Sequence, residues 1–585
     1  MNCIPERLPS RATSFLTRIN HHSSIVDSVM NVKRAFLLLP IVFLFTACKK
    51  NSSTPDPNPP PPTTFSFSSL SVNGSFTGFT YYGVPTTTRL RFGFSESLDR
   101  QSIPNAVSFR DKSGTVVNFN YTFENNDSVF VVQAANPLNY LTQYVVSIST
   151  NLKSKKNGTL QSAIDVTLLS GIDSSRKFPV ITDDSLLSLI QKQTFKYFWD
   201  FAHPVSGLAR ERNTSGDVVT SGGSGFGVMA ILAGINRNFI SRADGLTRLQ
   251  KIVGFLKNTA QRFHGAYPHW LNGSSGVVIP FSTKDNGADL VETSYLFQGL
   301  LCARQYFNGG ATDETNLRTD INQLWNEVEW DWFRKNNENV LYWHWSPNYN
   351  WEMNHPIRGW NEALITYALA ASSTTHSIPK IVYDNGWAQN GTIKNNNTYL
   401  GIQLPLGEPY GGPLFFAHYS FLGINPHDLT DAYANYWTQN TSHSLINYNY
   451  CKTNPKGFFG YSDSSWGLTA SDIPNGYTAS SPTNDVGVIA PTAAISSLPY
   501  TTTESMKALK FFYYVLGDKL WKEYGFVDAF SLHQLWFADS FLAIDQGPII
   551  VMIENHRSGL LWNLFMSCPE VKSGMTKLGF TSPYL

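Results

Sequence analysis

The 585-residue chain is 42% apolar, carries a formal net charge of +1 and has only 15% charged residues. This length and composition suit two or three domains with one large core, and the low charge excludes a disordered or highly solvated protein. No basic stripe indicates a nucleic-acid surface, so we expect no nucleic-acid partner. Aromatic residues make up 14% of the chain, which suits sugar stacking but equally suits the filling of a large core.

The first fifty residues carry the three parts of an export signal. Met30 begins a short basic region, residues 35–45 form an apolar run too short to span a bilayer with margin, and small residues precede Cys48. This pattern resembles the lipobox of bacterial lipoproteins. The resemblance implies that residues 1–47 are a signal peptide, with Met30 as the true start, and that Cys48 is lipidated. The alternative is a chance cysteine after a secretory signal.

On this interpretation the protein is a lipoprotein of the bacterial cell envelope, periplasmic or on the outer-membrane surface, and touches the membrane only through its lipid anchor. Residues 48–64 are rich in Pro, Ser, Thr and Asn and predict an extended, semi-rigid linker. After Cys48 only Cys302, Cys451 and Cys568 remain. An odd number of thiols makes no disulfide framework, and their spacing does not match zinc ligands, so the core must hold the fold.

Short runs of alternating apolar and polar residues fill the segment 65–172. The runs are separated by Gly, Asn, Asp and Pro, and they predict strands at 65–72, 88–94, 116–123, 128–134, 144–150 and 164–170. Strands at this spacing predict a small all-β sandwich, and their order resembles the bacterial Ig-like modules. Such a domain could bind carbohydrate, but we favour a spacer or packing role because the fold alone does not fix a function.

The pattern becomes helical from about residue 180 to residue 585. Apolar residues near a 3.6-residue period predict helices at 185–202, 225–236, 242–263, 288–307, 314–334, 358–372, 427–441, 502–520 and 546–565, with shorter pieces at 412–419 and 490–497. No parallel strands alternate with them, which argues against a doubly wound sheet. Paired helices joined by Gly-rich and aromatic loops predict a mainly α fold, an α/α toroid with a cleft at one end.

Three acids lie close together at the start of the helix predicted at 288–307. Asp285, Asp289 and Glu292 are spaced i, i+4 and i+7, which in a helix places them on one face. Acids in a first turn also cap free N–H groups and complement the helix dipole, and this alone could explain Asp285 and Asp289. Glu292 has no Lys or Arg at i±3 or i±4, and Glu is rarely buried unpaired. All three are candidate catalytic carboxylates.

A fourth candidate, Glu362, enters an apolar helix directly after Trp360 and Asn361. An exposed Arg358–Glu362 pair at i, i+4 is the structural alternative and would contribute only a few tenths of a kcal/mol. Burial among the apolar residues that follow would instead raise the pKa of Glu362, which suits a general acid. We predict a catalytic role for Glu362 and substrate contacts for Trp360 and Asn361.

Other polar and aromatic residues are candidate substrate contacts, each with a structural alternative. They are His418, Tyr419, Trp466, Asp545, Gln546 and Arg557. A lone histidine is more often a hydrogen-bonded core residue, Asp545 could be an N-cap, and Arg557 could simply pair with Glu554. No phosphate-binding loop, G-x-S-x-G elbow, H-E-x-x-H motif or EF-hand order is present. We therefore expect no cofactor and no metal.

Seven segments of the helical region resemble one family in the right order. These are 224–237, 285–301, 358–369, 411–420, 464–477, 490–499 and 544–562. They are similar to the glycoamylase-like family of bacterial proteins, in particular to glycoside hydrolase family 144, the endo-β-1,2-glucanases. The resemblance implies an (α/α)6 toroid over 180–585, hydrolysis of linear β-1,2-glucan to sophoro-oligosaccharides, and inversion at the anomeric carbon without a cofactor.

The acids of the family's cleft fall on Asp285, Asp289, Glu292 and Glu362. On this resemblance Glu362 is the predicted general acid, Asp289 or Asp285 activates water, and Glu292 orients water or binds a sugar, in a monomer that acts on a polysaccharide or oligosaccharide. An inverting pair stands roughly 6.5–9.5 Å apart to leave room for that water. Two alternatives stay open: another glucan-active glycosidase or transglycosylase, glucoamylase-like in specificity, and a non-catalytic glycan-binding lipoprotein.

Overall fold

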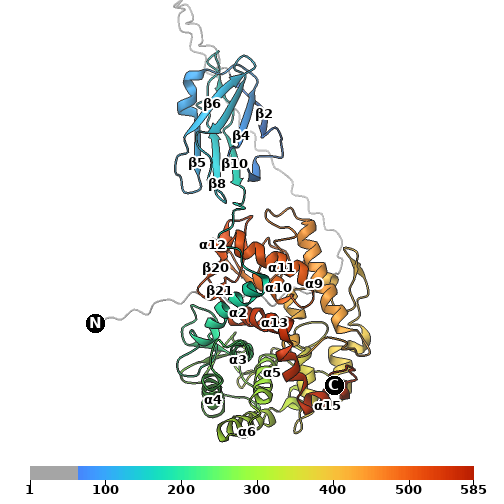
Figure 1. The fold of residues 1–585 in the computed structure, drawn as a ribbon. Coiled ribbons are helices and arrows are strands. Elements are labelled where there is room, and N and C mark those ends of the chain that lie inside the picture. Colours follow the sequence, from blue (N-terminus) through green and yellow to red (C-terminus); the bar gives the residue numbers. More distant parts are fainter. Residues whose placement is uncertain (1–63) are drawn as a thin grey trace, which may run out of the picture. The chain divides into compact units, whose positions relative to one another are not determined.

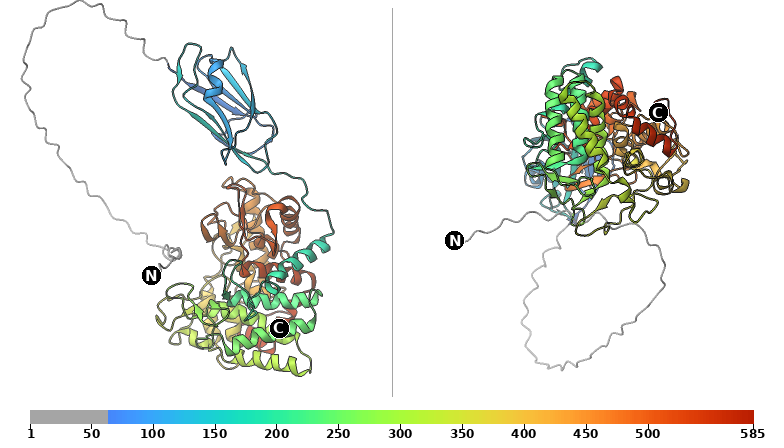
Figure 2. Two further views of the ribbon diagram at one scale, coloured as in Figure 1. Left: turned by 90° about the vertical axis from the view of Figure 1, so that its left-hand side faces the viewer. Right: turned by 90° about the horizontal axis from the view of Figure 1, so that it is seen from below.

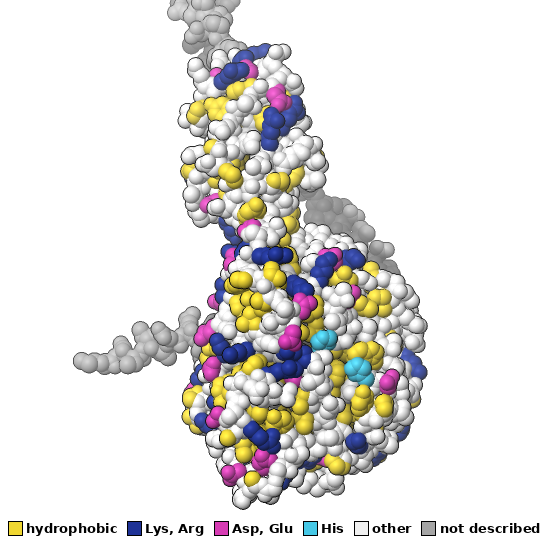
Figure 3. All heavy atoms as spheres, viewed as in Figure 1, with side chains coloured by type: hydrophobic (Ala, Val, Ile, Leu, Met, Phe, Trp, Pro, Cys, Tyr) yellow, Lys and Arg dark blue, Asp and Glu magenta, His cyan; other side chains and the backbone are white. Residues whose placement is uncertain are grey.

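The computed structural model describes residues 64–585, which form a strand-rich unit and a helical unit that includes Thr167–Leu585 (Figure 1). The predicted signal peptide, Cys48 and nearly all of the linker lie outside the described residues. In the part of the chain that is described, no helix is long and apolar enough to cross a membrane. Over the face of the helical unit in Figure 3, basic and acidic side chains are interspersed, as the small net charge leads one to expect.

The strand-rich unit contains two four-stranded sheets, which confirms the predicted β-sandwich. Their strand orders are β2-β4-β7-β6 and β3-β10-β8-β5. The elements are β1 (Thr64–Phe65), β2 (Phe67–Val72), β3 (Thr80–Val84), β4 (Arg89–Phe94), α1 (Ile103–Ala106), β5 (Val107–Asp111), β6 (Phe119–Glu124), β7 (Val129–Ala134), β8 (Gln143–Ile148), β9 (Thr159–Leu160) and β10 (Ile164–Ser170). Alternate residues such as Leu90 and Phe92 are fully buried, so the alternation of apolar and polar residues marks the side chains that lie on the inner faces of the sheets. Sequence reasoning missed β3 and β5.

The helical unit contains long helices joined by loops and short strand pairs. Its helices are α2 (Asp183–Trp199), α3 (Ser221–Asn236), α4 (Arg242–Asn258), α5 (Leu290–Tyr306), α6 (Thr312–Asn326), α7 (Leu364–Ser372), α8 (Lys380–Val382), α9 (Tyr436–Thr453), α10 (Pro491–Ser496), α11 (Thr502–Lys510), α12 (Gly517–Leu520), α13 (Ala543–Ser558), α14 (Leu560–Met566) and α15 (Pro569–Leu578). Its strand pairs include β11 (Val218–Thr220) with β12 (Trp270–Asn272) and β13 (Val278–Ile279), and β14 (Ala288–Asp289) with β15 (His344–Trp345).

The remaining strands of this unit are two-stranded ribbons in the loops. They pair β16 (Thr398–Tyr399) with β17 (Ile402–Gln403), β18 (Ala470–Ile473) with β19 (Gly476–Ala479), β20 (Trp521–Lys522) with β21 (Gly525–Phe526), and β22 (Phe530–Ser531) with β23 (Trp536–Phe537). Short pairs of this kind fix where a long loop turns without adding a layer to the fold. The loops that connect the helices are therefore ordered by local backbone pairing.

Helices of two kinds alternate along the helical unit. α3, α7 and α10 are buried over almost their whole length, and α5 and α13 over all but their last residues, whereas α4, α6, α11 and α15 bury one face and expose the other. α3 packs between α5 and α13, and α10 packs on α13. The green helices α3 to α6 lie side by side in both views of Figure 2. The uniformly apolar helices thus form the interior, and the amphipathic ones cover it.

Several predicted helix boundaries are wrong. The helix expected at 427–441 is instead α9, which begins at Tyr436 because Asn435 caps it by accepting a hydrogen bond from Thr438 N. α6 ends at Asn326 rather than at residue 334. α7 begins only at Leu364, so Glu362 precedes the helix. In each case a polar cap or a turn overrides the extension of the apolar period.

The tightest helix crossing joins α3 to α5 at two glycines. A Cβ on Gly225 would lie 2.0 Å from the carbonyl oxygen of Tyr295, and a Cβ on Gly299 would lie 2.1 Å from the carbonyl oxygen of Gly225. Both obstacles are backbone atoms, which cannot rotate away. The two helices are therefore in direct backbone contact, and any side chain at either position would force them apart.

This contact predicts a large stability difference between two glycine-to-alanine substitutions. Gly225→Ala should lower the free energy of unfolding by about 3 kcal/mol or more, because the methyl group overlaps fixed backbone. Gly254→Ala is the matched control: it lies inside α4, nothing is within 4 Å of its added Cβ, and it should stabilise the fold by about 0.5–1 kcal/mol. Denaturant unfolding of both variants checks this, and equal effects would contradict the close crossing.

Candidate active site

The acids at the start of α5 do not form the helical row that their spacing predicts. Asp289 is the N-cap of α5, and its Oδ1 accepts hydrogen bonds from Val291 N at 3.0 Å and Glu292 N at 2.9 Å. Asp285 lies in the turn before β14, so only Glu292 is inside the helix. Capping, the alternative explanation, is therefore correct for Asp289. The three acids nevertheless converge, because the turn folds back over the helix end.

Two histidines that sequence reasoning missed lie against these acids. β14 pairs with β15 so that Asp289 is opposite His344, whose Nε2 is 3.3 Å from Asp285 Oδ2 and 3.6 Å from Asp289 Oδ2. Next to β12, His269 places Nδ1 3.1 Å from Asp289 Oδ2 and Nε2 3.9 Å from Glu292 Oε1. Only tertiary pairing brings these histidines to the acids. The one sequence signal is that each has a tryptophan beside it.

Glu292 is held by the N-terminus of α3. Its Oε2 accepts hydrogen bonds from Gly222 N at 2.7 Å and from Thr220 Oγ1 at 3.2 Å. The free N–H groups and the positive end of the helix dipole stabilise a carboxylate at this position. A Cβ on Gly222 would lie 2.5 Å from Glu292 Oε2, so the approach requires glycine. An acid two turns into the predicted helix thus finds its partner on another helix.

Glu362 has its backbone anchored, and its carboxyl group has only its own backbone N–H as a donor. The Glu362 carbonyl oxygen accepts hydrogen bonds from Tyr295 OH at 3.4 Å and from Ser420 Oγ. The residue is half-buried, and no side chain of the described residues donates a hydrogen bond to its carboxylate. The alternative, an Arg358–Glu362 pair, does not form, since Arg358 donates to Asn385 O instead. The carboxyl group is therefore available to a bound molecule.

The pKa of Asp289 is lowered, whereas the pKa values of Glu362, Asp285 and Glu292 are raised; for Glu292 the main cause is burial, which outweighs the opposing charge of His269. Burial, followed by repulsion from Asp289 and Glu292, raises the pKa of Glu362 to about 7. Burial and the Asp289 charge raise the pKa of Asp285 to about 7. Burial would also raise the pKa of Asp289, but the His269 hydrogen bond and the nearby histidines outweigh it and lower that pKa. Acids that hold a proton near neutral pH thus lie beside one that stays ionised, the arrangement acid–base catalysis needs.

A cation would find three donor groups here at suitable spacing. The ligand atoms of His269, Asp285 and Asp289 lie within 4.8 Å of one another. However, both His269 nitrogens point at carboxylates, and although burial opposes it, the charges of Glu292 and Asp289 raise the pKa of His269 to about 10. A metal ligand must be the neutral imidazole. The donor set therefore fits a protonated histidine better than a metal.

A second acidic cluster surrounds Asp545 in the first turn of α13. Asp545 and Asp528 are almost fully buried together, and Asp528 Oδ2 accepts a hydrogen bond from Asp472 N at 2.7 Å. Burial and the Asp528 charge raise the pKa of Asp545 well above its usual value. Arg212 Nη1 pairs with Asp472 Oδ2 at 3.2 Å. Asp545 is thus 1% exposed and lies beside Asp528, while its Oδ2 has no hydrogen-bond partner among the described residues, so its contact with a sugar stays a prediction.

For five more predicted contacts, the structure shows side chains that belong to the core or the outer surface. The ring of Trp360 packs against Trp387, Phe421 and Tyr436, and Trp466 is fully buried with Nε1 donating to Glu504 O at 3.2 Å. His418 Nε2 lies 2.9 Å from Ser497 Oγ, and Gln546 Nε2 donates to Phe526 O at 2.9 Å. Arg557 pairs with Asp184 and Gln191 rather than with Glu554, so it too is occupied elsewhere.

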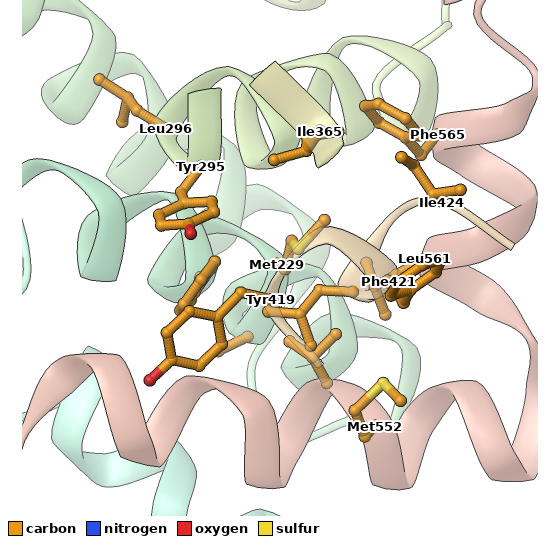
Figure 4. Packing of buried hydrophobic residues seen from close by; sticks show 14 of the residues in the cluster. Met229, Tyr295, Leu296, Ile365, Tyr419, Phe421, Ile424, Met552, Leu561 and Phe565 are labelled. Carbon is orange, nitrogen blue, oxygen red and sulfur yellow. The ribbon is translucent and has the colours of Figure 1, made fainter. Parts of the chain in front are cut away.

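Tyr419 and Asn361 are the predicted contacts that stay near Glu362. The ring of Tyr419 meets the ring of Tyr295 edge to face, with 5.7 Å between centroids (Figure 4). Burial and the charge of Asp545 raise the pKa of the Tyr419 hydroxyl, and Glu362 adds to this effect. Asn361 Oδ1 accepts a hydrogen bond from Ala363 N at 2.9 Å, which shapes the turn that carries Glu362. Their contact with a substrate stays a prediction.

A proton-bearing carboxyl group opposite a set of buried carboxylates is the arrangement that defines a glycoside hydrolase. A family model described as "Putative glucoamylase" matches residues 354–569, and one described as a bacterial Ig-like domain matches residues 70–168. The endo-β-1,2-glucanase from Chitinophaga pinensis, solved with sophorotriose and glucose, is 55% identical with a TM-score of 0.68, over 69% of this chain and 100% of that one.

Two further relatives carry related names. The β-1,2-glucanase from Parabacteroides distasonis is 36% identical with a TM-score of 0.67, over 88% of this chain and 73% of that one. An exo-β-1,2-glucooligosaccharide sophorohydrolase (non-reducing end) from the same species is 46% identical over 71% of this chain, which spans only 61% of that protein's length. The chain therefore belongs to the glycoamylase-like family of glycoside hydrolases, with an N-terminal bacterial Ig-like domain.

The raised pKa of Glu362 predicts how stability depends on pH. Between about pH 4.5 and pH 7 the folded protein keeps a proton that the unfolded chain releases, so this residue lowers stability as the pH rises. Glu362→Gln cannot ionise and should be more stable than the parent above pH 7, with the difference vanishing at low pH. Thermal unfolding across this range measures it.

Glu327→Gln is the control, for which we expect a stability difference from the parent of opposite sign. Burial is outweighed there by hydrogen bonds from Gln323 and Arg262, which lower the pKa of Glu327. This variant should therefore be less stable than the parent at neutral pH, with a difference that shrinks on acidification. A Glu362→Gln difference that stays constant with pH would contradict the raised pKa.

Proposed function

We propose that this protein is an endo-acting glycoside hydrolase that cleaves linear β-1,2-glucan to sophoro-oligosaccharides with inversion at the anomeric carbon. The observation that carries the proposal is the proton-bearing carboxyl group of Glu362 opposite the acids at the start of α5. Homologues named as β-1,2-glucanases and a sophorohydrolase supply the substrate class.

In this mechanism Glu362 donates its proton to the leaving glycosidic oxygen, directly or through a substrate hydroxyl. A water molecule attacks the anomeric carbon from the opposite side and gives its proton to a carboxylate near α5. Electrostatic repulsion links Glu362 to Asp289 and Glu292, but no hydrogen bond joins their carboxyl groups in the described structure. The mechanism requires room for the sugar and the water between these carboxyl groups.

The contacts of Asp289 narrow the choice of base. Its Oδ1 accepts two backbone N–H groups, and its Oδ2 faces His269 Nδ1 and Trp343 Nε1 at 3.1 and 3.3 Å. A carboxylate has about four acceptor positions, all of which are used here, and Asp289 is fully buried. We therefore assign Asp289 to holding the site and assign the activation of water to Asp285 or Glu292, which retain slight exposure.

The helix packing supports an (α/α)6 toroid. The buried helices α3, α5, α7, α10 and α13 alternate in sequence with helices that expose one face, and the short helical turns at Leu414–Ala417 and Tyr419–Leu422 complete the inner set. α3 contacts both α5 and α13, and α5 contacts α7. A closed ring of this kind would place the loops before α5 and α7 at one end, together with the acids that they carry.

Cleavage from a chain end is the second candidate. The 46% identical relative is named as an exo-acting sophorohydrolase from the non-reducing end, so chains of similar sequence carry both modes of action. An endo enzyme needs a cleft open at both ends, whereas an exo enzyme needs one end closed. We also propose that the chain is anchored in the bacterial envelope through a lipid on Cys48, since the pattern before this cysteine resembles a lipobox.

Incubation of the purified protein with linear β-1,2-glucan tests the substrate and the mode of action. We expect oligosaccharides of several lengths from the earliest time points, released with inverted anomeric configuration, and no products from starch. Release of the disaccharide alone from the start would favour the exo candidate. Starch hydrolysis without β-1,2-glucan hydrolysis would overturn the proposed substrate.

Glu362→Gln tests the general acid. The amide keeps the shape of the side chain but cannot donate the proton to the leaving oxygen, so kcat on β-1,2-glucan should fall by about 10²–10⁴-fold. Glu523→Gln is the control, because Glu523 is exposed in the turn between β20 and β21, and it should retain full activity. If Glu362→Gln kept full turnover, the catalytic account would fail.

A further inference from the structure

His269 is the cation that the acids at the start of α5 share. Among the described residues, the ion pairs of Asp289 and Glu292 are all with histidines. The nearby cations are occupied: Arg212 pairs with Glu211 and Asp472, and Lys284 pairs with Glu352. Two buried carboxylates therefore depend on imidazole for their countercharge.

Both nitrogens of His269 face carboxyl groups, an arrangement that favours a proton on each nitrogen. Nδ1 lies 3.1 Å from Asp289 Oδ2, and Nε2 points at Glu292 Oε1 from 3.9 Å. A neutral imidazole would turn one nitrogen lone pair toward a carboxylate, which is repulsive, whereas the imidazolium presents an N–H to each. Stacking on Phe281, with 4.3 Å between ring centroids, fixes the plane of the ring.

His344 faces the same acids but does not play this part. Its Nε2 approaches Asp285 and Asp289, while its Nδ1 is buried without a partner among the described residues. Burial lowers the pKa of His344 to about 4, so it is neutral where His269 is charged. The titratable groups that face His269 are thus Asp285, Asp289 and Glu292 from the α5 side, His344 from β15, and Glu211.

We propose that His269 is a positioning residue that, as an imidazolium held between Asp289 and Glu292, fixes Asp289 and sets the pH at which the water-activating carboxylate becomes ionised. This inference rests on the proposed function for its catalytic consequence. The carboxylate accepts a proton from water, so it must be ionised first. Loss of the positive charge would raise the pKa of each of the three acids, because their mutual repulsion would no longer be compensated.

The test compares His269→Gln with His269→Lys in the full chain. Glutamine removes the charge but can still donate to Asp289, whereas lysine keeps the charge in a different shape. For His269→Gln we expect the acidic limb of the plot of kcat/KM against pH, measured on β-1,2-glucan, to move up by about one pH unit. At pH values below this limb, kcat/KM should therefore fall about tenfold. KM should change little. His269→Lys should keep the limb near that of the parent.

His376→Gln is the matched control, because His376 Nδ1 lies 3.0 Å from Asp331 Oδ1 in a half-exposed pair outside the site. It should leave the profile unchanged. If His269→Gln lowered activity by the same factor at every pH, the residue would have a structural role only and the proposal would be wrong. The proposal would also be wrong if the acidic limb of His269→Lys moved up in pH by as much as that of His269→Gln.

A second measurement, of stability, does not depend on catalytic activity. The folded pKa of His269 lies above the value of about 6.5 for the unfolded chain, so its contribution to stability is complete below that pH and disappears as the pH rises toward 10. Thermal unfolding of the parent should show this loss, and His269→Gln should not. If the parent failed to cleave β-1,2-glucan yet showed the loss, the proposed function would fail while the charge assignment stood. A parent without the loss would refute the imidazolium.

Discussion

The direct backbone contact between α3 and α5 is the constraint on which the site depends. Gly225 and Gly299 allow the two helices to touch, and this contact places the first turn of α3 against the first turn of α5. Gly222 N can then donate to the Glu292 carboxylate. A larger separation would leave this buried acid without its backbone donor, which would be strongly unfavourable. Packing and electrostatics are therefore parts of one arrangement.

The site concentrates negative charge where a protein interior normally resists it. Helix N-termini compensate two of the acids: α5 donates backbone N–H groups to Asp289, and α3 donates one to Glu292. Imidazole supplies the remaining countercharge from His269. Glu362 has only its own backbone N–H as a donor to its carboxyl group, and burial raises its pKa to about 7. Burial also raises the pKa of Glu292 despite its helix N-terminus, so of the four acids only Asp289, which has two backbone donors and the nearby histidines, has a lowered pKa.

The sequence predicted the main features of the fold from local pattern. Alternation revealed most strands of the sandwich, and uniformly apolar segments marked the buried helices α3, α7 and α13. Extension of the helical period back to Asp285 failed, because the Asp-Asn-Gly turn and the Asp289 cap stop the helix. A period describes residues inside a helix and carries no information about where side-chain capping ends it.

The candidate site was predictable only in its acids. Glu292 stood out because it has no Lys or Arg at i±3 or i±4, and Glu362 because it precedes an apolar segment; both features are visible in sequence. Trp360 and Trp466 stand beside acids or amides in sequence, but their rings face the core. Adjacency along the chain does not fix the direction of a side chain. His269 and His344 approach the acids only through tertiary contacts, which local pattern cannot show.

The hydrogen bonds of the four acids also divide their roles. Asp289 has every acceptor position used and no exposure, so it cannot take a proton from water without losing the cap of α5. Glu362 is the opposite case, with a fixed backbone and a carboxyl group to which no other residue of the described part of the chain donates a hydrogen bond. Asp285 and Glu292 lie between these extremes, each with one oxygen that lacks a close hydrogen bond. A water molecule between them would meet a proton acceptor on one side of the sugar and the Glu362 acid on the other.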